Sequence, residues 1–380
     1  MCDDYLDAPS GKSPRSWDRS TRLLIAWLEK YFTFHGERMP NRYEILLPYG
    51  TVQREIYEQY KKYVENPVCN SQFYKKWKEN FKFVKAKKTN TWSFTRCTTC
   101  VTLERQLTKT TCTEMRAFYR QKKEEHNLRQ MFERKTYYSK RELAQQSPRQ
   151  HMSIIIDGMD QAKTNLPHFA GRNPKNLNPV DLLHTHVTEV LSHGHGSFHA
   201  YVDIGEYPHD PNLTINIILK ELLRQAKESN NFLPPILYIQ ADNCWRENKN
   251  RYVFSFLQLL VSERIFNEVH MSFLIVGHTH EDIDARFSMI SRTLGSKDAE
   301  IFEDLLKILQ SAERVTKIFD VKKWLEPNLN VAQHATQPLH YKFVNVEGIV
   351  NFFYKDYQHQ PWTPLVGHFL QKVPEGVPEL

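Results

Sequence analysis

The stretch that decides the fold is MSIIIDG, residues 152–158. Its apolar run predicts a buried strand, and Asp157 follows where the run ends. Two more strands are expected at about 183–192 and 197–204, joined by the turn sequence SHGHG. The rest of the predicted order is a helix from Asn212 through Ser229, a strand at 236–239, a helix at 248–264, a strand at 271–276 and a helix at about 280–294.

This order, β-β-β-α-β-α-β-α, predicts an α/β domain over residues 151–300 with the ribonuclease-H-like arrangement. In that arrangement an antiparallel hairpin extends a mixed sheet that carries helices on its faces. Asp157 follows the first strand, Asp242 follows the fourth, and Asp284 lies in the helix after the fifth. Neighbouring strands lie about 4.8 Å apart. Acids far apart in the sequence are therefore expected at one edge of the sheet.

Three acids at one sheet edge predict metal-dependent chemistry at phosphorus. Two divalent cations about 3.5–4 Å apart can hold the attacking and leaving oxygens of a phosphodiester. Carboxylate oxygens are hard ligands that suit Mg²⁺ or Mn²⁺. The alternative for each aspartate alone is a turn or helix-capping role. The three positions together favour a nuclease.

The third acid has two candidates. Asp282 and Asp284 lie on opposite sides of the buried stripe of the last predicted helix, each about a quarter-turn away, so helical geometry does not choose. Thr279-x-x-Asp282 fits a capping box. That role for Asp282 leaves Asp284 as the better ligand, and the choice between them stays open.

Polar residues beside the acids are secondary candidates. Asn243, Asn248, Lys249 and Asn250 could contact phosphate at a helix N-terminus, or an asparagine among them could simply cap the helix. His278 and His280 follow a predicted strand end. They could position a leaving group or bind metal, and polar packing is the alternative.

Two blocks resemble a known family. DNCWRENKN (242–250) and GHTHEDIDARF (277–287) are similar to the core blocks of transposon-derived eukaryotic proteins related to the DDE transposases of the CACTA, Mirage and Chapaev group. Residues 37–40, 77–83 and 97–100 are also similar, so the resemblance spans roughly residues 20–330. It implies cut-and-paste DNA transposition with Asp157, Asp242 and Asp284 as metal ligands.

The sequence departs from that family at two points. Glu247 stands where related sequences often have Gln, and the third position is Asp rather than Glu, followed by Ser291 instead of an acid. Many such genes are domesticated remnants. A catalytically inactive protein that binds DNA or another protein is therefore the alternative function.

Charge divides the chain into two halves. Residues 1–150 hold 30 Lys+Arg against 17 Asp+Glu, or +13; residues 151–380 hold 21 against 27, or −6, which sums to the net +7. Most of the excess lies in residues 75–88 and 116–141, where aromatic residues are interleaved. This pattern favours a DNA-binding surface, with a solvated helical face as the alternative. A nuclear location follows from that substrate; otherwise the cytoplasm is expected.

The remaining regions are predicted more coarsely. Residues 1–16 are expected to be a disordered tail. Residues 17–96 are expected to form three helices, either like a helix-turn-helix or like any small bundle. A CxxC segment and one long charged helix (103–146) fill residues 97–150. Residues 301–380 contain a helix and short strands (341–344 and 349–354) before a tail.

The cysteines predict a second metal site. Cys97, Cys100, Cys112 and His126 could supply four soft ligands to a structural Zn²⁺, with a redox pair or free thiols as the alternatives. Six cysteines in 380 residues do not form a secretory disulfide framework. The polar N-terminus predicts no signal peptide, and no window approaches the roughly 20 apolar residues of a membrane helix. A homo-oligomer is compatible with the sequence.

Overall fold

The structure is a computed structural model that describes residues 18–38, 43–47, 51–86, 97–171, 174–195, 197–279, 281–330, 337–365 and 367–376. The predicted tail (1–16), part of the 37–40 block and His280 lie outside these residues. The chain divides into two units, residues 1–131 and 132–380, and each is described by itself. None of the described helices combines the length and apolar character needed to cross a bilayer.

The first unit is built mainly from helices, as predicted. They are α1 (Arg19–His35), α2 (Gln53–Tyr63), α3 (Asn70–Asn80), α4 (Thr98–Lys109) and the N-terminal part of α5 (Thr113–Gln146). A small sheet of β1 (Glu37–Arg38), β2 (Ile45–Leu47) and β3 (Val84–Ala86) accompanies them. The sequence did not reveal these strands, because two or three residues are too few to show an alternating pattern.

Aromatic side chains make the core of the first unit. The predicted spacing of four buries Phe73, Trp77 and Phe81. The ring of Phe32 lies 4.7 Å from that of Trp77 and 5.0 Å from that of Phe81, edge-on in both cases. At the start of α1, Asp18 accepts a hydrogen bond from the backbone N–H of Thr21 (2.8 Å). Asp18 is therefore the N-cap of α1.

The prediction of one helix over residues 103–146 is wrong. The segment forms two helices, α4 and α5, which are separated by residues 110–112. Thr110, the C-cap of α4, has an extended backbone. The Thr-Thr-Cys sequence there disfavours continuation of the helix, because these residues have low helix propensity. The chain therefore turns between α4 and α5, where the sequence predicts one continuous helix.

The second unit contains one nine-stranded mixed sheet. Its strand order is β12-β11-β10-β8-β7-β4-β5-β6-β9. The strands are β4 (His151–Gly158), β5 (His186–His193), β6 (Ser197–Asp203), β7 (Ile236–Ala241), β8 (Glu268–Phe273), β9 (Ala312–Arg314), β10 (His340–Val346), β11 (Ile349–Lys355) and β12 (Thr363–Pro364). From β4 to β6 the neighbours are antiparallel, whereas β4, β7 and β8 run parallel.

Five α-helices accompany this sheet: α6 (Pro211–Glu228), α7 (Arg251–Ser262), α8 (Asp282–Leu294), α9 (Phe302–Leu309) and α10 (Val321–Leu325). Together with the strands, α6, α7 and α8 follow the predicted order. The 3-10 helices at Gln161–Lys163, Pro179–Asp181 and Glu326–Asn328 lie in the connections. The cap of α6 is Asp210 rather than Asn212, and its carboxylate accepts from the backbone N–H of Asn212 (2.8 Å).

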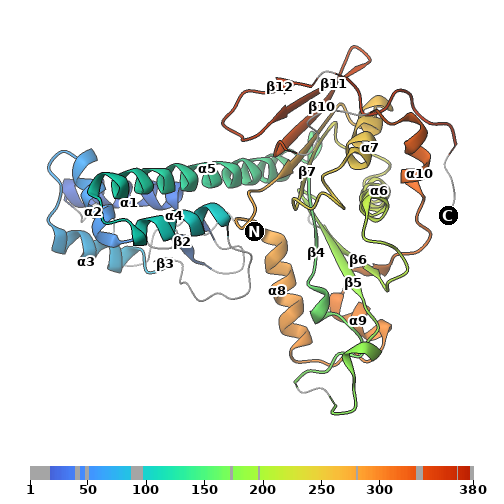
Figure 1. Ribbon diagram of the computed structural model, residues 1–380, viewed down its shortest axis with the longest axis horizontal. Coiled ribbons are helices and arrows are strands. Elements are labelled where there is room, and N and C mark those ends of the chain that lie inside the picture. The colour runs from blue at the N-terminus through green and yellow to red at the C-terminus, as the bar shows by residue number, and fades with distance from the viewer. Residues whose placement is uncertain are drawn as a thin grey trace. The chain divides into compact units, whose positions relative to one another are not determined.

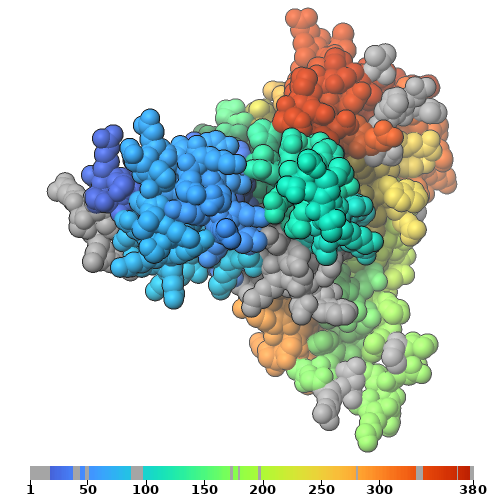
Figure 2. All heavy atoms as spheres, turned by 60° about the vertical axis from the view of Figure 1, so that its left-hand side comes forward, coloured from blue at the N-terminus to red at the C-terminus, as the bar shows by residue number. Residues whose placement is uncertain are grey.

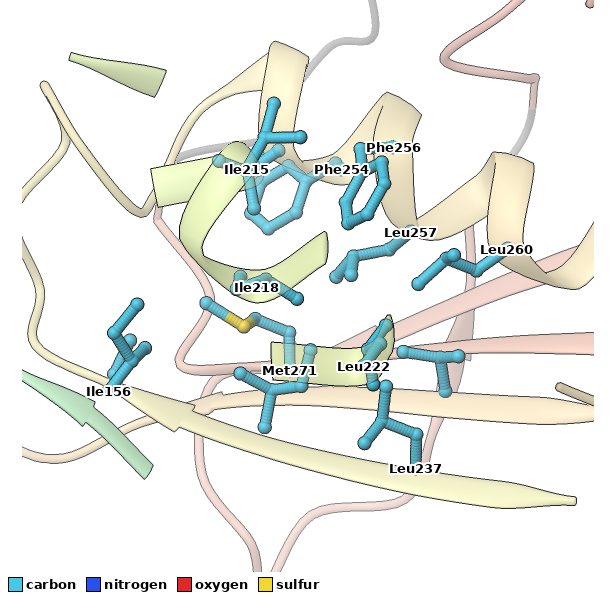
Figure 3. Packing of buried hydrophobic residues seen from close by; sticks show 14 of the residues in the cluster. Ile156, Ile215, Ile218, Leu222, Leu237, Phe254, Phe256, Leu257, Leu260 and Met271 are labelled. Atoms are coloured by element: carbon cyan, nitrogen blue, oxygen red, sulfur yellow. The ribbon is translucent and has the colours of Figure 1, made fainter. Parts of the chain in front are cut away.

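The two faces of the sheet are covered differently. On one face, which α6 and α7 cover (Figure 1), Ile218 and Leu257 of these helices pack with Ile156 and Met271 of the strands in one apolar cluster (Figure 3). Ile155 points to the opposite face, where it contacts Ile283 of α8 and Tyr137 of the C-terminal part of α5. Alternate residues of β4 thus face different helices.

Helix α8 continues into a second apolar contact on that side. Ile290 and Leu294 pack with Met159, Val187 and Leu305. In the space-filling view, orange atoms of the α8–α9 region lie against green atoms of the chain around residues 160–200 (Figure 2). The helix is therefore fixed along its whole length on the side of the sheet that Asp157 faces.

The C-terminal region belongs to the same sheet. β10 pairs antiparallel with β8 through Phe343 and Val269, and β11 pairs with β10. The predicted strands at 341–344 and 349–354 are confirmed, and they extend the sheet beyond β8. The sequence does not predict that these strands belong to this sheet, because pairing between strands far apart in the chain leaves no local pattern.

Candidate metal sites

The ends of β4 and β7 place two of the predicted acids side by side. These strands are parallel neighbours in which Ile156 is paired with Ala241. Asp157 and Asp242 are the next residue of each strand. Since paired strands lie about 4.8 Å apart, the two aspartates occupy adjacent positions at one edge of the sheet.

The pKa of Asp157 reflects the presence of three other acids nearby. Burial raises the pKa of its carboxyl to about 8, and the negative charges of Asp242 and Asp284 contribute next. Glu247 adds a smaller effect in the same direction, while the Gly158 N–H, donating to Oδ1 at 2.9 Å, opposes it. Four acids therefore share one electrostatic environment, which a bound cation would stabilise.

Asp242 is held in place by its own loop. Its Oδ1 accepts from the backbone N–H of Cys244 (3.1 Å) and from the side-chain amide of Asn248. Asn248 is buried, and its own Oδ1 accepts from the hydroxyl of Thr214 on α6 (3.2 Å). Asn248 is thus engaged in orienting Asp242.

The helix cap of α8 corrects the capping argument made from the sequence. The capping box is formed by Glu281 and Asp284, not by Thr279 and Asp282: the N–H of Glu281 donates to Oδ2 of Asp284 at 2.8 Å. The helix begins at Asp282, with Glu281 as its N-cap, so the predicted register of the box was wrong. Asp284 nevertheless acts on the pKa of Asp157.

Asp282 is turned into a buried polar network. It accepts hydrogen bonds from the hydroxyl of Tyr137 (2.5 Å), from Arg141 (3.2 Å) and from His193 (2.8 Å). Burial opposes ionisation, but the hydrogen bonds from His193 and Tyr137 and the charge of Arg141 lower the pKa of Asp282 below its usual value. This aspartate anchors α8 to the sheet.

The same network contains a Ser–His–Asp sequence of contacts. The hydroxyl of Ser153 lies 3.2 Å from Nδ1 of His193, whose Nε2 meets Asp282. Ser153 is only 2% exposed, in the middle of a central strand. A nucleophile needs an approach for its substrate, so these three residues are structural.

The other polar candidates of this loop have packing roles. Asn250 caps α7, since its Oδ1 accepts from the N–H groups of Tyr252 and Val253, both at 3.1 Å; the capping alternative is confirmed for it. Lys249 is buried and donates to Asn243 (3.0 Å), which in turn donates to the Leu274 carbonyl (2.7 Å). Burial lowers the pKa of Lys249 to about 8.

A small pocket beside Asp157 contains residues that the sequence did not single out. Its lining includes Gly158, His186, Glu247 and Asn248. A Cβ at position 158 would lie 3.1 Å from Nε2 of His186, so the glycine allows this close approach. His186 stacks on His209 with ring centroids 3.8 Å apart. In the sequence, only the glycine directly after Asp157 indicated a close approach at this point. His186 is brought to the pocket by the pairing of β4 with β5, which no local pattern shows.

The spare acids near the sheet have structural partners. Asp160 caps the 3-10 helix Gln161–Lys163. Asp203 is buried and accepts from the N–H groups of Gly205 and Glu206, while the side chain of Glu206 pairs with Arg314 at 2.6 Å. Asp157, Asp242, Glu247 and Asp284 are the acids that act together on the pKa of Asp157.

A different group of side chains in the first unit has the geometry of a closed metal site. The helices α4 and α5 form a hairpin in which Cys97 Sγ lies 3.3 Å from His126 Nε2. The ligand atoms of Cys97, Cys100 and His126 all lie within 4.8 Å of one another. Among the described residues, the acids form no group that meets this criterion.

The chemistry of this group suits a soft metal. Cys97 and His126 are buried, and Cys100 is half-buried. The hydrogen bond with Cys97, together with burial, raises the pKa of the Cys100 thiol far above its ordinary value. A bound zinc ion would reverse this, because its charge stabilises thiolates outright. Cys97, Cys100 and His126 could hold a metal such as zinc.

Cys112 is not part of this group, which corrects the predicted ligand set. It lies between α4 and α5, at the closed end of the hairpin, whereas Cys97 and Cys100 lie at the start of α4. A helix of 12 residues is about 18 Å long. Cys112 is exposed and donates to Glu114 at 2.9 Å. His278, a candidate for metal binding or polar packing, is a buried imidazole after β8 in the second unit.

Residues 175–360 match the model of a domain of unknown function, DUF7869. The matched segment contains β5 to β11, with Asp242 and Asp284, and begins after Asp157. No curated protein and no solved structure matches the chain. The function of the domain therefore has to be argued from its own residues.

Proposed function

We propose that the second unit is a ribonuclease-H-like domain that cleaves and joins DNA strands with divalent cations, as a DDE-type transposase does. The observation that carries this is the pairing of Ile156 with Ala241, which sets Asp157 and Asp242 side by side where two parallel central strands end. The order β4-β5-β6-α6-β7-α7-β8-α8 supports the assignment, and so does the resemblance of the 242–250 and 277–287 blocks to such transposases.

The residues have distinct roles in this proposal. Asp157, Asp242 and Asp284 would hold Mg²⁺ or Mn²⁺, and the oxygens of these carboxylates fit such hard cations. The cations supply charge neutralisation and an activated water or hydroxyl at the phosphodiester. Asn248 keeps Asp242 oriented through the hydroxyl of Thr214. Glu247 adds a further negative charge near Asp157, and it lines the pocket beside that residue.

The test is the loss of strand cleavage in single carboxamide variants. We expect Asp157→Asn and Asp242→Asn each to abolish Mn²⁺-dependent cleavage or joining of a labelled DNA duplex by the full chain. Asp160→Asn is the matched control, since its carboxylate only caps a 3-10 helix. Unchanged cleavage in either site variant would refute the proposal.

A second candidate is a protein that binds DNA without cutting it. It is favoured by the Asp at the third position and by the engagement of one oxygen of Asp284 in the capping box. The first unit would supply binding, since Lys75, Lys78 and Lys82 are exposed along and after α3. Salt-sensitive DNA binding in a wild-type protein that never cleaves with Mn²⁺ would select this candidate.

We also propose that Cys97, Cys100 and His126 hold a structural Zn²⁺. Three protein ligands leave one tetrahedral position open for a further ligand. The metal would fix the α4–α5 hairpin, whose other polar contact across the helices is Lys123 with Glu104 at 3.6 Å. This role is independent of the acids.

A further inference from the structure

The loop between β7 and α7, residues 242–250, presents an exposed tryptophan beside the acids. Trp245 is 69% exposed, whereas the other described tryptophans are buried or half-buried. It stands three positions after Asp242. A large aromatic side chain left in water at such a place is a common mark of a binding surface.

The loop is too well held for this exposure to be a consequence of mobility. The side-chain amide of Asn250 donates to the carbonyls of Trp245 and Glu247, both at 3.2 Å. The backbone N–H groups of Asn248 and Lys249 both donate to the carbonyl of Cys244, at 2.8 and 3.0 Å. The backbone under the indole is therefore preorganised, and it shares Asn248 with Asp242.

Two arginines lie close to Trp245 in the chain, at positions 246 and 251. Arg246 and Arg251 are both exposed, and the guanidinium of Arg251 lies 5.1 Å from the ring centroid of Tyr252. An aromatic face flanked by arginines suits a nucleic-acid strand, because bases stack on the ring and phosphates meet the cations. A protein partner would require a broader apolar patch.

We propose that Trp245 stacks on an unpaired base of the DNA strand whose phosphate lies at the acids, and that Arg246 contacts a phosphate of the same strand. This rests on the proposed function. Three residues span at most about 11 Å, and successive nucleotides rise about 3.4 Å along a strand. The stacked base therefore lies within a few nucleotides of the reacting phosphate. Stacking would favour DNA ends whose two strands are unpaired at that position.

The experiment measures binding without cleavage. A fluorescent single-stranded DNA oligonucleotide is titrated with the full chain in Ca²⁺, and its dissociation constant is read from anisotropy. Stacking of a base on an aromatic ring is worth about 1–3 kcal/mol, so Trp245→Ala should weaken binding by about 5- to 100-fold. Trp245→Phe should retain most of the affinity.

The matched control is Phe232→Ala, which removes another exposed ring (46%) from the loop that enters β7 at its opposite end. Abasic substitutions walked along the oligonucleotide should weaken wild-type binding at one position and leave Trp245→Ala unaffected there. Equal binding by Trp245→Ala and Phe232→Ala, or no binding of the oligonucleotide by the wild type, would overturn the inference. Because this assay measures binding without cleavage, its result can be interpreted even if the nuclease assay fails. The nuclease assay can likewise be interpreted if Trp245→Ala binds DNA like the wild type.

Discussion

The two units differ in how closely their candidate metal ligands lie together. In the first, the ligand atoms of Cys97, Cys100 and His126 already lie within 4.8 Å of one another. In the second, Asp157 and Asp242 are adjacent in the sheet but repel each other, and the pKa of Asp157 rises to about 8. Neutral thiols and imidazoles can pack together without a metal, whereas carboxylates cannot gather without protons or cations.

We propose that this difference reflects two roles, structural for the first group and catalytic for the second. A structural zinc site is closed by protein ligands and contributes directly to folding. A two-cation catalytic site must stay open for substrate, and it keeps unbalanced charge until cations and phosphate arrive. Removing a ligand should therefore destabilise the first unit and stabilise the second.

The largest expected effect is at the cysteines. Cys97→Ser should lower the zinc content measured by mass spectrometry from about one ion per chain to none, because structural zinc contributes about 10–16 kcal/mol of binding free energy in small zinc-finger peptides. The α4–α5 hairpin should then become sensitive to proteolysis.

Cys112→Ser is the matched control for this prediction, because that thiol is exposed and bonded only to Glu114 in the same turn. It should bind zinc like the wild type. An equal zinc content in Cys97→Ser and the wild type would remove the proposed site and, with it, the comparison between the two units.

The next effect is at the anchor of α8. Asp282→Ala removes the acceptor of Tyr137, Arg141 and His193 from a buried network. The free energy of unfolding should fall by about 3 kcal/mol, the cost typical of breaking a buried charge pair. Asp304→Ala, which removes only a surface pair with Lys307, should change it by less than about 1 kcal/mol. Similar denaturation midpoints for the two variants would contradict this role.

A smaller effect of opposite sign is expected at Asp157. Its pKa is near 8 in the folded protein and near 3.8 in the unfolded chain, so the folded state binds the extra proton between these values. The stability that this group contributes is thus full below about pH 4 and is lost as the pH rises toward 8. Without divalent cations, Asp157→Asn should raise Tm at pH 7.5 by about 5 °C.

Differential scanning calorimetry over pH 5–8 in a chelating buffer checks this prediction. The gap in Tm between Asp157→Asn and the wild type should widen as the pH rises. A variant that is less stable than the wild type at every pH would show that the acids do not repel one another.

Much of the fold could be predicted because the central strands are continuous apolar runs. MSIII and ILYI indicate β4 and β7; Asp157 directly follows the first run, and Asp242 stands three residues after the end of the second. Once two such strands are parallel neighbours, the adjacency of Asp157 and Asp242 follows. The sequence therefore predicted two of the acids from local pattern alone.

The rest depended on contacts between distant segments. The cap of α8 was predicted two residues too early, because Thr279 and Glu281 are both chemically able to begin a capping box. Cys112 was grouped with Cys97 because the break between α4 and α5 was not recognised. His186 reaches Asp157 only through strand pairing, which no local pattern encodes.

The most direct test is a crystal structure of the full chain soaked in Mn²⁺, with anomalous scattering used to locate the ions. We expect manganese bound by carboxylate oxygens of both Asp157 and Asp242, at about 2.2 Å, with Asp284 in the same site. Strong manganese peaks elsewhere with none between Asp157 and Asp242, at a concentration that saturates binding, would contradict the account.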